Sequence, residues 1–239
     1  MPELIDLSQE IYHKRPSRPS QPSCAIWDST THEESKNQYK HGGISFRIKG
    51  LIICDHEATH TDAFTHIDPR PEAESIDQLP LTMFYTSAIC LDMSHIDVHG
   101  YITTADIQKE LDRYGLDIRK GDTILFRYGI EDIDIDRERE RYFNGFAGPD
   151  KECAEWLVDQ GVVNFATESR SADGHAAHGY EVDPAQPVHQ ICRDRKVLNT
   201  ENLRIPKKLV GKRFQYIGFP IKIRGGSGAP VRAVAVLDE

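Results

Sequence analysis

The feature of this 239-residue sequence that most constrains its fold is a short run in which histidine and aspartate recur at fixed intervals. The run contains His56, His60, Asp62 and His66. On a helix, the side chain of Asp62 would lie about 200° around the axis from that of His60. On an extended chain the four positions are all even, so their side chains point to one face. The spacing therefore predicts an extended segment that directs imidazoles and a carboxylate toward one point.

The residues around this run also favour an extended chain. The run follows residues 44–54, where apolar positions alternate with polar ones and then become continuous, as in a strand. Threonines within the run and the pair Asp68-Pro69 after it disfavour a helix. Ala58, which would share the face of the histidines, is small and leaves room there.

The ligand set that such a segment presents is typical of a metal site. Two imidazoles and one carboxylate suit Zn²⁺ or Mn²⁺. A third imidazole lies further along the same face. The spacing alone leaves one alternative open, which is that these polar side chains line an ordinary turn.

Turn signals divide the rest of the chain into the strands and helices of a mixed α/β protein. We expect strands at residues 44–54, 88–93, 123–126, 162–166, 214–219 and 231–237, and residues 4–8 fit a further short strand. One helix begins at a threonine cap, residues 103–104, and ends at Gly115; another begins at Pro149-Asp150 and ends at Gly161. A shorter helix is expected at residues 188–193. Because no linker interrupts this pattern, residues 1–239 are expected to form a single domain.

Composition and charge exclude several classes of partner. The chain carries a formal charge of −9, which argues against nucleic acid or an anionic membrane as a partner. No apolar run approaches the ~18 residues of a membrane span, and the first residues have neither the basic start nor the apolar stretch of a signal peptide. We therefore expect a cytoplasmic protein that acts on a small molecule. The five widely spaced cysteines match no metal or redox motif and are expected to be buried thiols.

The histidine run resembles the motif of a known family, the metal-dependent cyclase-like hydrolases. The family pattern is H-x-G-T-H-x-D-x-P-x-H, and the family includes bacterial kynurenine formamidase, isatin hydrolase and trans-dienelactone hydrolase. This sequence keeps five motif residues at the expected spacing: His56, Thr59, His60, Asp62 and His66. It departs from the pattern twice, with Ala58 in place of the glycine and Phe64 in place of the proline.

The resemblance continues along most of the chain. Pro187-Val188-His189 is similar to the family's P-A-H, and Glu201-Asn202-Leu203 follows His189 at the family's spacing of twelve residues. Residues 168–173 are similar to D-T-x-S-x-D, with Glu168 for the first aspartate. Residues 220–232 resemble the glycine-rich end of the family's chains.

The resemblance implies a role for each matched site residue. Three residues would be ligands of a first metal ion: His56, His60 and Asp62. Asp62 and Glu201 would bridge to a second ion, which His189 would complete. His66 would be the general acid/base and not a ligand. Family members hold one ion, often manganese, or two zinc ions.

The resemblance also implies a fold and a reaction. The fold is a single mixed α/β domain of the swivelling β/β/α type, in a homo-oligomer that is a dimer or a tetramer. The expected reaction is attack of metal-activated water on the carbonyl carbon of a small amide, which cleaves its carbon–nitrogen bond; the amide is either an aryl formamide such as N-formylkynurenine or a cyclic amide such as isatin. Two alternatives stay open: a lactone hydrolase or dehydrating cyclase of the same fold, and a catalytically silent metal-binding protein.

Four aromatic residues are candidates for the wall of the substrate pocket, and two further histidines lie in the region that carries the site. Phe64 fits a pocket wall and the core equally well, and core packing is favoured for Trp27, Phe84 and Tyr85. His175 and His178 are expected in an exposed loop.

Overall fold

A nine-stranded mixed sheet forms the centre of the computed structural model, which describes residues 1–17, 21–36, 38, 43–130, 133–174 and 185–237. His175 and His178 lie outside these ranges. The middle strands β5, β7, β9 and β10 are parallel, and the strands that flank them on either side are antiparallel. The order across the sheet is β1 (Glu3–Asp6), β13 (Val234–Leu237), β11 (Arg213–Ile217), β5 (Tyr85–Asp92), β7 (Thr123–Arg127), β9 (Asn164–Thr167), β10 (Leu198–Glu201), β4 (His60–Asp62) and β12 (Gly228–Pro230).

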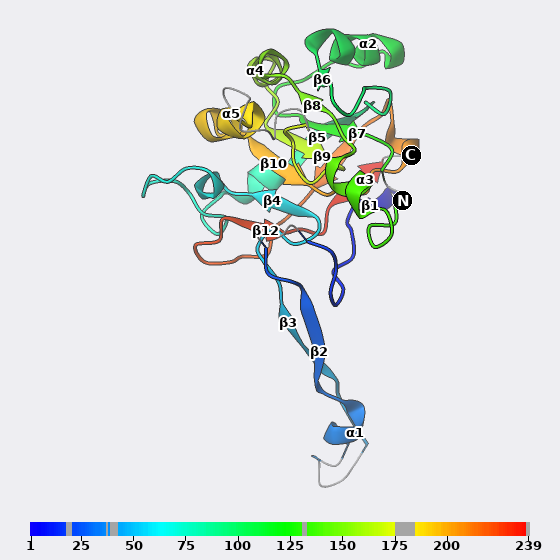
Figure 1. Cartoon of the computed structure of the whole chain (residues 1–239), viewed down its shortest axis with the longest axis vertical. Coiled ribbons are helices and arrows are strands. Elements are labelled where there is room, and N and C mark those ends of the chain that lie inside the picture. The colour runs from blue at the N-terminus through cyan, green and yellow to red at the C-terminus, as the bar shows by residue number, and fades with distance from the viewer. Residues whose placement is uncertain (18–20, 37, 39–42, 131–132, 175–184, 238–239) are drawn as a thin grey trace.

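Helices cover one face of this sheet (Figure 1). They are α2 (Thr104–Tyr114), α4 (Lys151–Asp159) and α5 (Pro187–Arg195), and a short α3 (Arg139–Asn144) lies near the edge. Helix α2 begins with a capping box between Thr103 and Asp106 and ends at Gly115, whose φ of 62° is a left-handed conformation. The predicted ends of this helix are therefore confirmed, as is the start of α4, where Asp150 accepts a hydrogen bond from the Cys153 amide.

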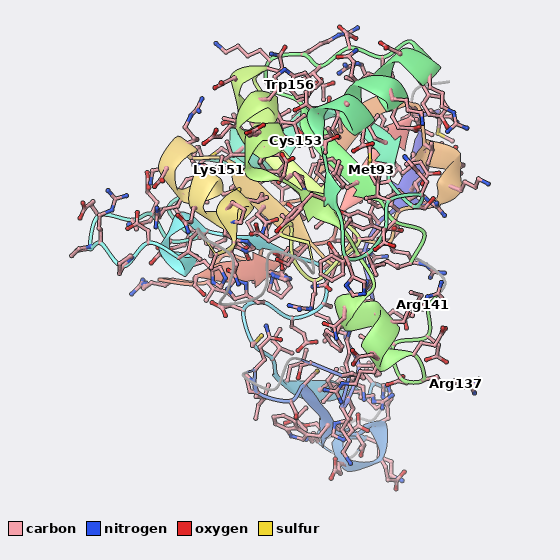
Figure 2. The ribbon with its side chains drawn as sticks, turned by 45° about the horizontal axis from the view of Figure 1, so that its top comes forward. Met93, Arg137, Arg141, Lys151, Cys153 and Trp156 are labelled. Atoms are coloured by element: carbon pink, nitrogen blue, oxygen red, sulfur yellow. The ribbon has the colours of Figure 1, made fainter. Side chains whose placement is uncertain are left out.

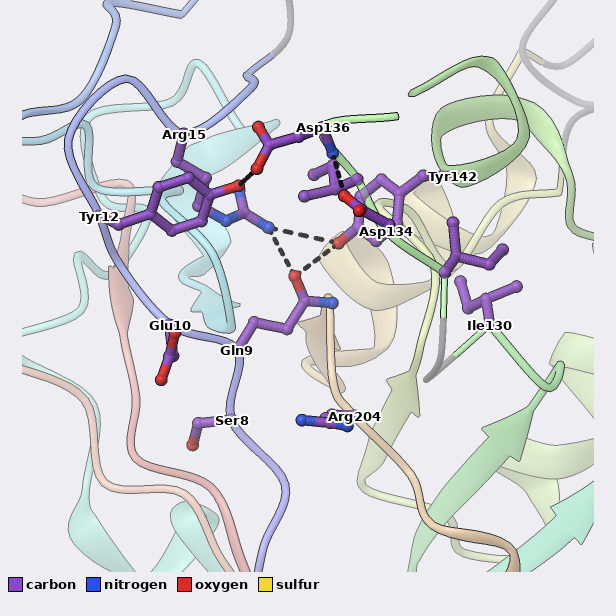
Figure 3. Close-up of a pocket in the computed structure, with 12 residues that line it drawn as sticks. Ser8, Gln9, Glu10, Tyr12, Arg15, Ile130, Asp134, Asp136, Tyr142 and Arg204 are labelled. Atoms are coloured by element: carbon purple, nitrogen blue, oxygen red, sulfur yellow. Dashed lines mark hydrogen bonds between the residues drawn. The ribbon is translucent and has the colours of Figure 1, made fainter. Parts of the chain in front are cut away.

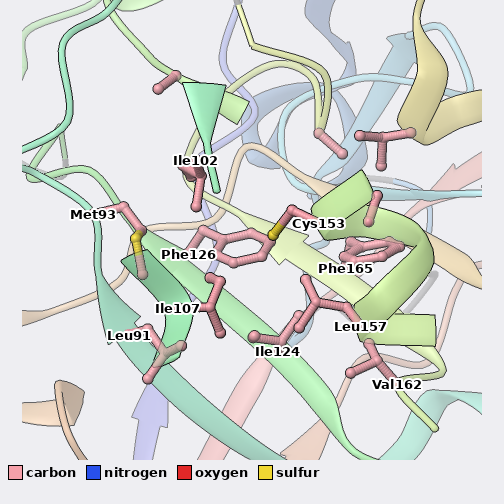
Figure 4. Packing of buried hydrophobic residues seen from close by; sticks show 14 of the residues in the cluster. Leu91, Met93, Ile102, Ile107, Ile124, Phe126, Cys153, Leu157, Val162 and Phe165 are labelled. Atoms are coloured by element: carbon pink, nitrogen blue, oxygen red, sulfur yellow. The ribbon is translucent and has the colours of Figure 1, made fainter. Parts of the chain in front are cut away.

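The main hydrophobic core lies between these helices and the sheet (Figure 4). Cys153 and Leu157 of α4 pack into the same cluster as Ile124 and Phe126 of β7. Lys151, by contrast, is on the exposed side of α4 (Figure 2). Leu125, between the two core residues of β7, packs in a second cluster on the other face of the sheet. Strand β7 is buried on both faces, which explains why its three central residues, 124–126, are apolar without alternation.

A two-stranded ribbon extends away from this body (Figure 1). It pairs β2 (Ala25–Thr30) with β3 (Ile48–Ile52), and the short helix α1 (His32–Ser35) follows β2. Two further short strands pair with each other: β6 (Tyr101–Ile102) and β8 (Gly148–Pro149). The strand expected at residues 44–54 is therefore shorter than predicted, and β2 was not predicted. Both ribbon strands lack buried residues, so neither shows the apolar alternation of a strand that covers a core.

The fold class predicted from the sequence, a mixed α/β domain, is confirmed. The cysteines are free thiols, of which four are buried and Cys54 is half-buried. Phe64 and Phe84 pack together in a third apolar cluster. The expectation of core packing was wrong for Trp27 and Tyr85, which are 47% and 54% exposed. No helix of the described residues is both long enough and apolar enough to cross a membrane.

The prediction that residues 56–66 form one extended segment was wrong. Only His60–Asp62 is a strand, and Phe64–His66 forms the 3₁₀ helix η1. Ala58 takes the left-handed conformation at φ 53°, which bends the chain between His56 and the strand. The family's glycine at this position would adopt that conformation without steric cost, whereas alanine adopts it with some strain. The side chains converge because the chain bends at Ala58 and again in η1, and not because the segment is extended.

Candidate active site

The centre of the site is built on the sheet edge where β4 lies between β10 and β12. The antiparallel register pairs His60 with Glu201 and Asp62 with Asn199. Paired residues project from the same face, so these four side chains form one group. Thr61, the residue between His60 and Asp62, lies on the other face and pairs its hydroxyl with that of Thr200 at 3.0 Å.

Three more histidines reach this group from separate elements. His56 lies in the turn before β4, His66 is the last residue of η1, and His189 is in the first turn of α5. The cavity they line has a volume of about 220 Å³ and also contacts Ser227. The structure thus brings together all six residues that the sequence singled out.

The inner distances place Asp62 at the middle of the group. Its Oδ1 lies 2.9 Å from His56 Nδ1 and 3.4 Å from His60 Nε2. Its Oδ2 lies 3.6 Å from His189 Nε2. Glu201 lies between two of these three histidines, with Oε2 3.5 Å from His60 Nε2 and Oε1 3.4 Å from His189 Nε2. Two sets of three ligand atoms therefore share Asp62: one with His56 and His66, the other with His189 and Glu201.

In three of the four imidazoles, the nitrogen that faces away from the carboxylates contacts another group of the protein. His60 Nδ1 lies 2.9 Å from the Ala58 carbonyl oxygen, which can only accept, so Nδ1 carries the proton and Nε2 keeps its lone pair. His189 Nδ1 contacts Asp173 Oδ2 at 2.5 Å, and His56 Nε2 contacts the Ser227 hydroxyl at 2.9 Å. Such contacts fix the tautomer and orientation of metal-ligating histidines.

Two residues of this outer layer were not assigned a role from the sequence. Asn199 Nδ2 donates to Asp62 Oδ2 at 2.9 Å and to Glu201 Oε1 at 2.7 Å. Asp173, which is fully buried, also accepts from the amides of Val188 and His189. Asn199 lies two residues before Glu201 and therefore on the same face of the strand. Asp173 is the last residue of the matched motif at residues 168–173. The sequence therefore held evidence that both residues lie at the site.

These residues fit a divalent cation. Asp62 and Glu201 are 7% and 3% exposed, and two carboxylates this close and this buried need a compensating positive charge. Asp62 Oδ1 accepts no hydrogen bond from any residue that the structure describes, although His56 Nδ1 is 2.9 Å away. Asp62 Oδ1 and His56 Nδ1 would lie this close without a hydrogen bond if both were ligands of one metal ion. Imidazole and carboxylate donors are those that Zn²⁺ and Mn²⁺ accept.

His66 differs from the other three histidines because it is exposed to the cavity. Its ring centroid lies 4.2 Å from that of His56 and 6.1 Å from that of His189. The protein packed around the ring lowers the pKa of His66 by desolvation. At neutral pH the imidazole is therefore uncharged and able to accept a proton.

A larger cavity of about 600 Å³ lies beside this site (Figure 3), and Arg15 is among the residues that line each of the two cavities. Arg15, Gln9 and Tyr142 form a hydrogen-bonded group in its wall. None of the six histidine and carboxylate residues lines it. The smaller cavity, which the histidines and Glu201 line, is therefore the candidate active site.

Comparisons of the sequence and of the structure with known proteins lead to the same group of proteins. A family model described as "Putative cyclase" matches residues 5–174. A kynurenine formamidase from Salinibacter ruber is 25% identical over 235 residues, covering 97% of this chain and 96% of its own. An isatin hydrolase from Roseibium aggregatum is 23% identical over 214 residues, covering 84% and 79%. The crystal structure of an isatin hydrolase bound to the product analogue thioisatinate superposes with a TM-score of 0.84 at 20% identity, covering 100% of this chain and 93% of that one.

Proposed function

The chain belongs to the putative cyclase family, and on that premise we propose that it is a metal-dependent hydrolase that cleaves the carbon–nitrogen bond of a small amide. The observation that carries this proposal is the convergence of six side chains at one site, where buried Asp62 contacts three imidazoles and buried Glu201 contacts two of them. Both curated relatives have the names of hydrolases that act on amides, an isatin hydrolase and a kynurenine formamidase.

We assign the ligands by the shared position of Asp62. One ion would be held by His56, His60 and Asp62, and a second by Asp62, Glu201 and His189. Zn²⁺ or Mn²⁺ would fill one or both positions. A divalent cation bound here lowers the pKa of a coordinated water toward ~7 and polarises a carbonyl group.

The chain's own residues supply the proton transfers and the orientation. His66, neutral and open to the cavity, accepts the proton released when water adds to the amide carbon and returns it to the leaving nitrogen. The carbon–nitrogen bond breaks after water has added to the carbon. A linear amide then gives an acid and an amine, whereas a cyclic amide gives one ring-opened product that carries both groups. Asp173 and Asn199 hold His189 and the two carboxylates in place throughout.

The substrate is proposed to be an aryl formamide such as N-formylkynurenine or a cyclic amide such as isatin. Chelator-stripped protein, reloaded with Zn²⁺ or Mn²⁺, should release acid from one of these two compounds. A dienelactone serves as the third member of the panel. Hydrolysis of the lactone alone would replace the amide assignment, and no turnover by demonstrably metal-loaded protein on any panel member would favour a silent metal-binding protein.

Replacing Asp173 with asparagine is expected to weaken metal binding by about 10- to 100-fold, because the His189 ring loses the carboxylate that orients it. Competition with a chromogenic chelator measures the change. Asp194→Asn, on the exposed end of the same helix, is the matched control and should bind metal as the wild type does. Equal affinities in all three proteins would remove Asp173 from the site.

We also propose that the protein is a homo-oligomer, a dimer or a tetramer, located in the cytoplasm and without nucleic-acid or membrane partners. The homo-oligomer is supported by the ribbon, which exposes large apolar side chains: Trp27 (47%), Ile48 (50%), Leu51 (55%) and Ile52 (55%). Apolar side chains gathered on one projecting element are typical of a surface that binds a partner.

Replacing Leu51 and Ile52 together with aspartate is expected to yield a particle of one chain, 27.1 kDa, because charge on the ribbon opposes its burial against another copy. Light scattering should report a multiple of that mass for the wild type. Leu4→Asp, which alters an exposed apolar residue of β1, should leave the wild-type mass unchanged. A wild type that already scatters as a single chain would contradict the proposal.

A further inference from the structure

His56 faces the centre of the site with a different ring nitrogen from two other histidines of the cluster. His60 and His189 both present Nε2 to Glu201. His56 presents Nδ1 instead, at 2.9 Å from Asp62 Oδ1. In a neutral imidazole one nitrogen carries the proton and the other keeps the lone pair that binds a metal ion. His56 can therefore be a ligand in this orientation only when its proton is on Nε2.

A serine and an aspartate determine where the His56 proton lies. Ser227 Oγ is 2.7 Å from Asp55 Oδ2 and 2.9 Å from His56 Nε2. A carboxylate has only acceptors and a hydroxyl has one proton, so the Ser227 hydroxyl donates to Asp55 and its oxygen is left to accept. The group that donates to this oxygen is His56 Nε2–H. The lone pair of the ring consequently lies on Nδ1, which faces Asp62.

The geometry does not support the reverse arrangement, in which His56 Nδ1 carries the proton. That proton would be donated to Asp62, yet Asp62 Oδ1 accepts no hydrogen bond from any part of the chain that the structure describes. Asp55 does not hold the ring directly either, because its Oδ1 lies 3.9 Å from His56 Nε2, which is too long for a hydrogen bond. Asp55 therefore acts on His56 through the Ser227 hydroxyl.

The backbone that carries Ser227 is fixed in place and leaves room for the ring. Asp55 Oδ2 also accepts from the Ser227 amide at 2.9 Å, and the Ser227 carbonyl accepts from the Ala63 amide at 2.8 Å. The next residue, Gly228, lies directly against the imidazole: a Cβ at that position would come within 2.8 Å of His56 Cε1. The ring thus packs on the backbone of Gly228 while its Nε2 bonds to Ser227. The protein itself sets this orientation.

We propose that Asp55 and Ser227 are positioning residues that fix the Nε2–H tautomer of His56 and so make Nδ1 the atom that binds a metal ion. The inference rests on the proposed function in taking His56 as a metal ligand, and it adds two residues that act through that ligand. Partners that hold a ligating histidine in this way change metal affinity by about 10- to 100-fold. The same size of effect is expected here.

The first test observes the tautomer directly in the full-length, metal-free protein. Two-bond proton–nitrogen correlation spectra, recorded where the ring is neutral, distinguish the protonated ring nitrogen from the other, and loss of signals in His56→Ala assigns them. The wild type should be protonated at Nε2. Ser227→Ala should move the proton toward Nδ1, where Asp62 can accept it, and Ser227→Thr, which keeps a hydroxyl, should restore the wild-type spectrum. Protonation of the wild type at Nδ1, or an unchanged spectrum in Ser227→Ala, would overturn the inference.

The second test measures Zn²⁺ affinity by competition with a chromogenic chelator. Ser227→Ala is expected to weaken the ion that His56 holds by about 10- to 100-fold. Adding Asp55→Asn to Ser227→Ala should cost no further affinity, because Asp55 acts through the hydroxyl that is already lost. Ser75→Ala, which removes a hydroxyl that donates to Asp77 at 2.7 Å away from the cavity, is the control and should match the wild type. Unchanged affinity for every Zn²⁺ ion in Ser227→Ala, or a further loss in the double variant, would contradict the proposed relay.

Neither readout requires turnover, so the inference and the proposed function can fail separately. If the metal-loaded protein hydrolyses no amide while the tautomer and the Zn²⁺ affinity both respond to Ser227→Ala, the hydrolase assignment fails and the positioning role stands. If amides are hydrolysed but Ser227→Ala keeps the wild-type tautomer and Zn²⁺ affinity, the positioning role fails and the hydrolase assignment stands.

Discussion

Replacement of Asp62 with asparagine is expected to abolish turnover and to weaken metal binding by more than about 100-fold. Loss of a residue that only supports a ligand costs about 10- to 100-fold in affinity, and Asp62 is the carboxylate that both ligand sets share. Metal content after dialysis and the initial hydrolysis rate measure the two effects. Asp112→Asn, on the exposed face of α2, is the control and should retain both.

Stability provides an independent measure of the same variant. Metal at about 100 times its dissociation constant should stabilise the wild type by about 2.7 kcal/mol, because it binds the folded chain only. Asp62→Asn should not gain this stability. Without metal, the variant should melt no higher than the wild type, since Asp62 contacts His56, His60 and His189 and the fold holds its pKa well below its usual range. A metal-dependent rise in melting temperature equal to that of the wild type would show that Asp62 is not a ligand.

Replacement of His66 with alanine is expected to lower kcat by about 10²- to 10⁴-fold while metal content stays the same. This range is the usual contribution of general acid–base catalysis by a positioned side chain. The expectation follows from the exposure of His66 to the cavity and from its lowered pKa. Metal content by elemental analysis and kcat by acid release are the two measurements.

The His66 variant also decides between two roles that the geometry allows. Ligand atoms of His66, His56 and Asp62 lie close enough together to hold one ion. Loss of metal together with turnover would make His66 a ligand, and full activity would remove it from the mechanism. His95→Ala, an exposed histidine after β5, should keep both properties and controls for a general effect of losing an imidazole.

The parts of the fold that sequence predicts well are those with local causes. Helix α2 was placed correctly because its ends are set by Thr103 and Gly115, whose effects act within one turn. Strand β7 is predictable because it is buried on both faces and its three central residues, 124–126, are apolar. Strand β2 was not predicted because its residues cover no core, and among the described residues it pairs with β3 alone, which comes later in the chain at Ile48–Ile52.

The residues of the site were identified by type and spacing, but their conformation was not. An even spacing fits an extended chain, yet the left-handed Ala58 and the 3₁₀ helix at His66 deliver the same side chains by bending. The conformation of the segment depends on the pairing of β4 with β10 and β12, which lie far along the chain. The residue pattern of residues 56–66 alone does not reveal that pairing. Asn199 was overlooked because an amide carries no metal-ligand signal, although its position two residues before Glu201 puts it on the same face.

Amide hydrolysis by this protein is expected to depend on a metal ion held by this cluster. The measurement is the initial rate of hydrolysis of N-formylkynurenine and isatin by chelator-stripped protein as Zn²⁺ or Mn²⁺ is added stepwise. We expect no turnover without metal, then a rise with at least one of the two compounds that saturates at one or two ions per chain. Turnover by the stripped protein at the metal-loaded rate would contradict this expectation.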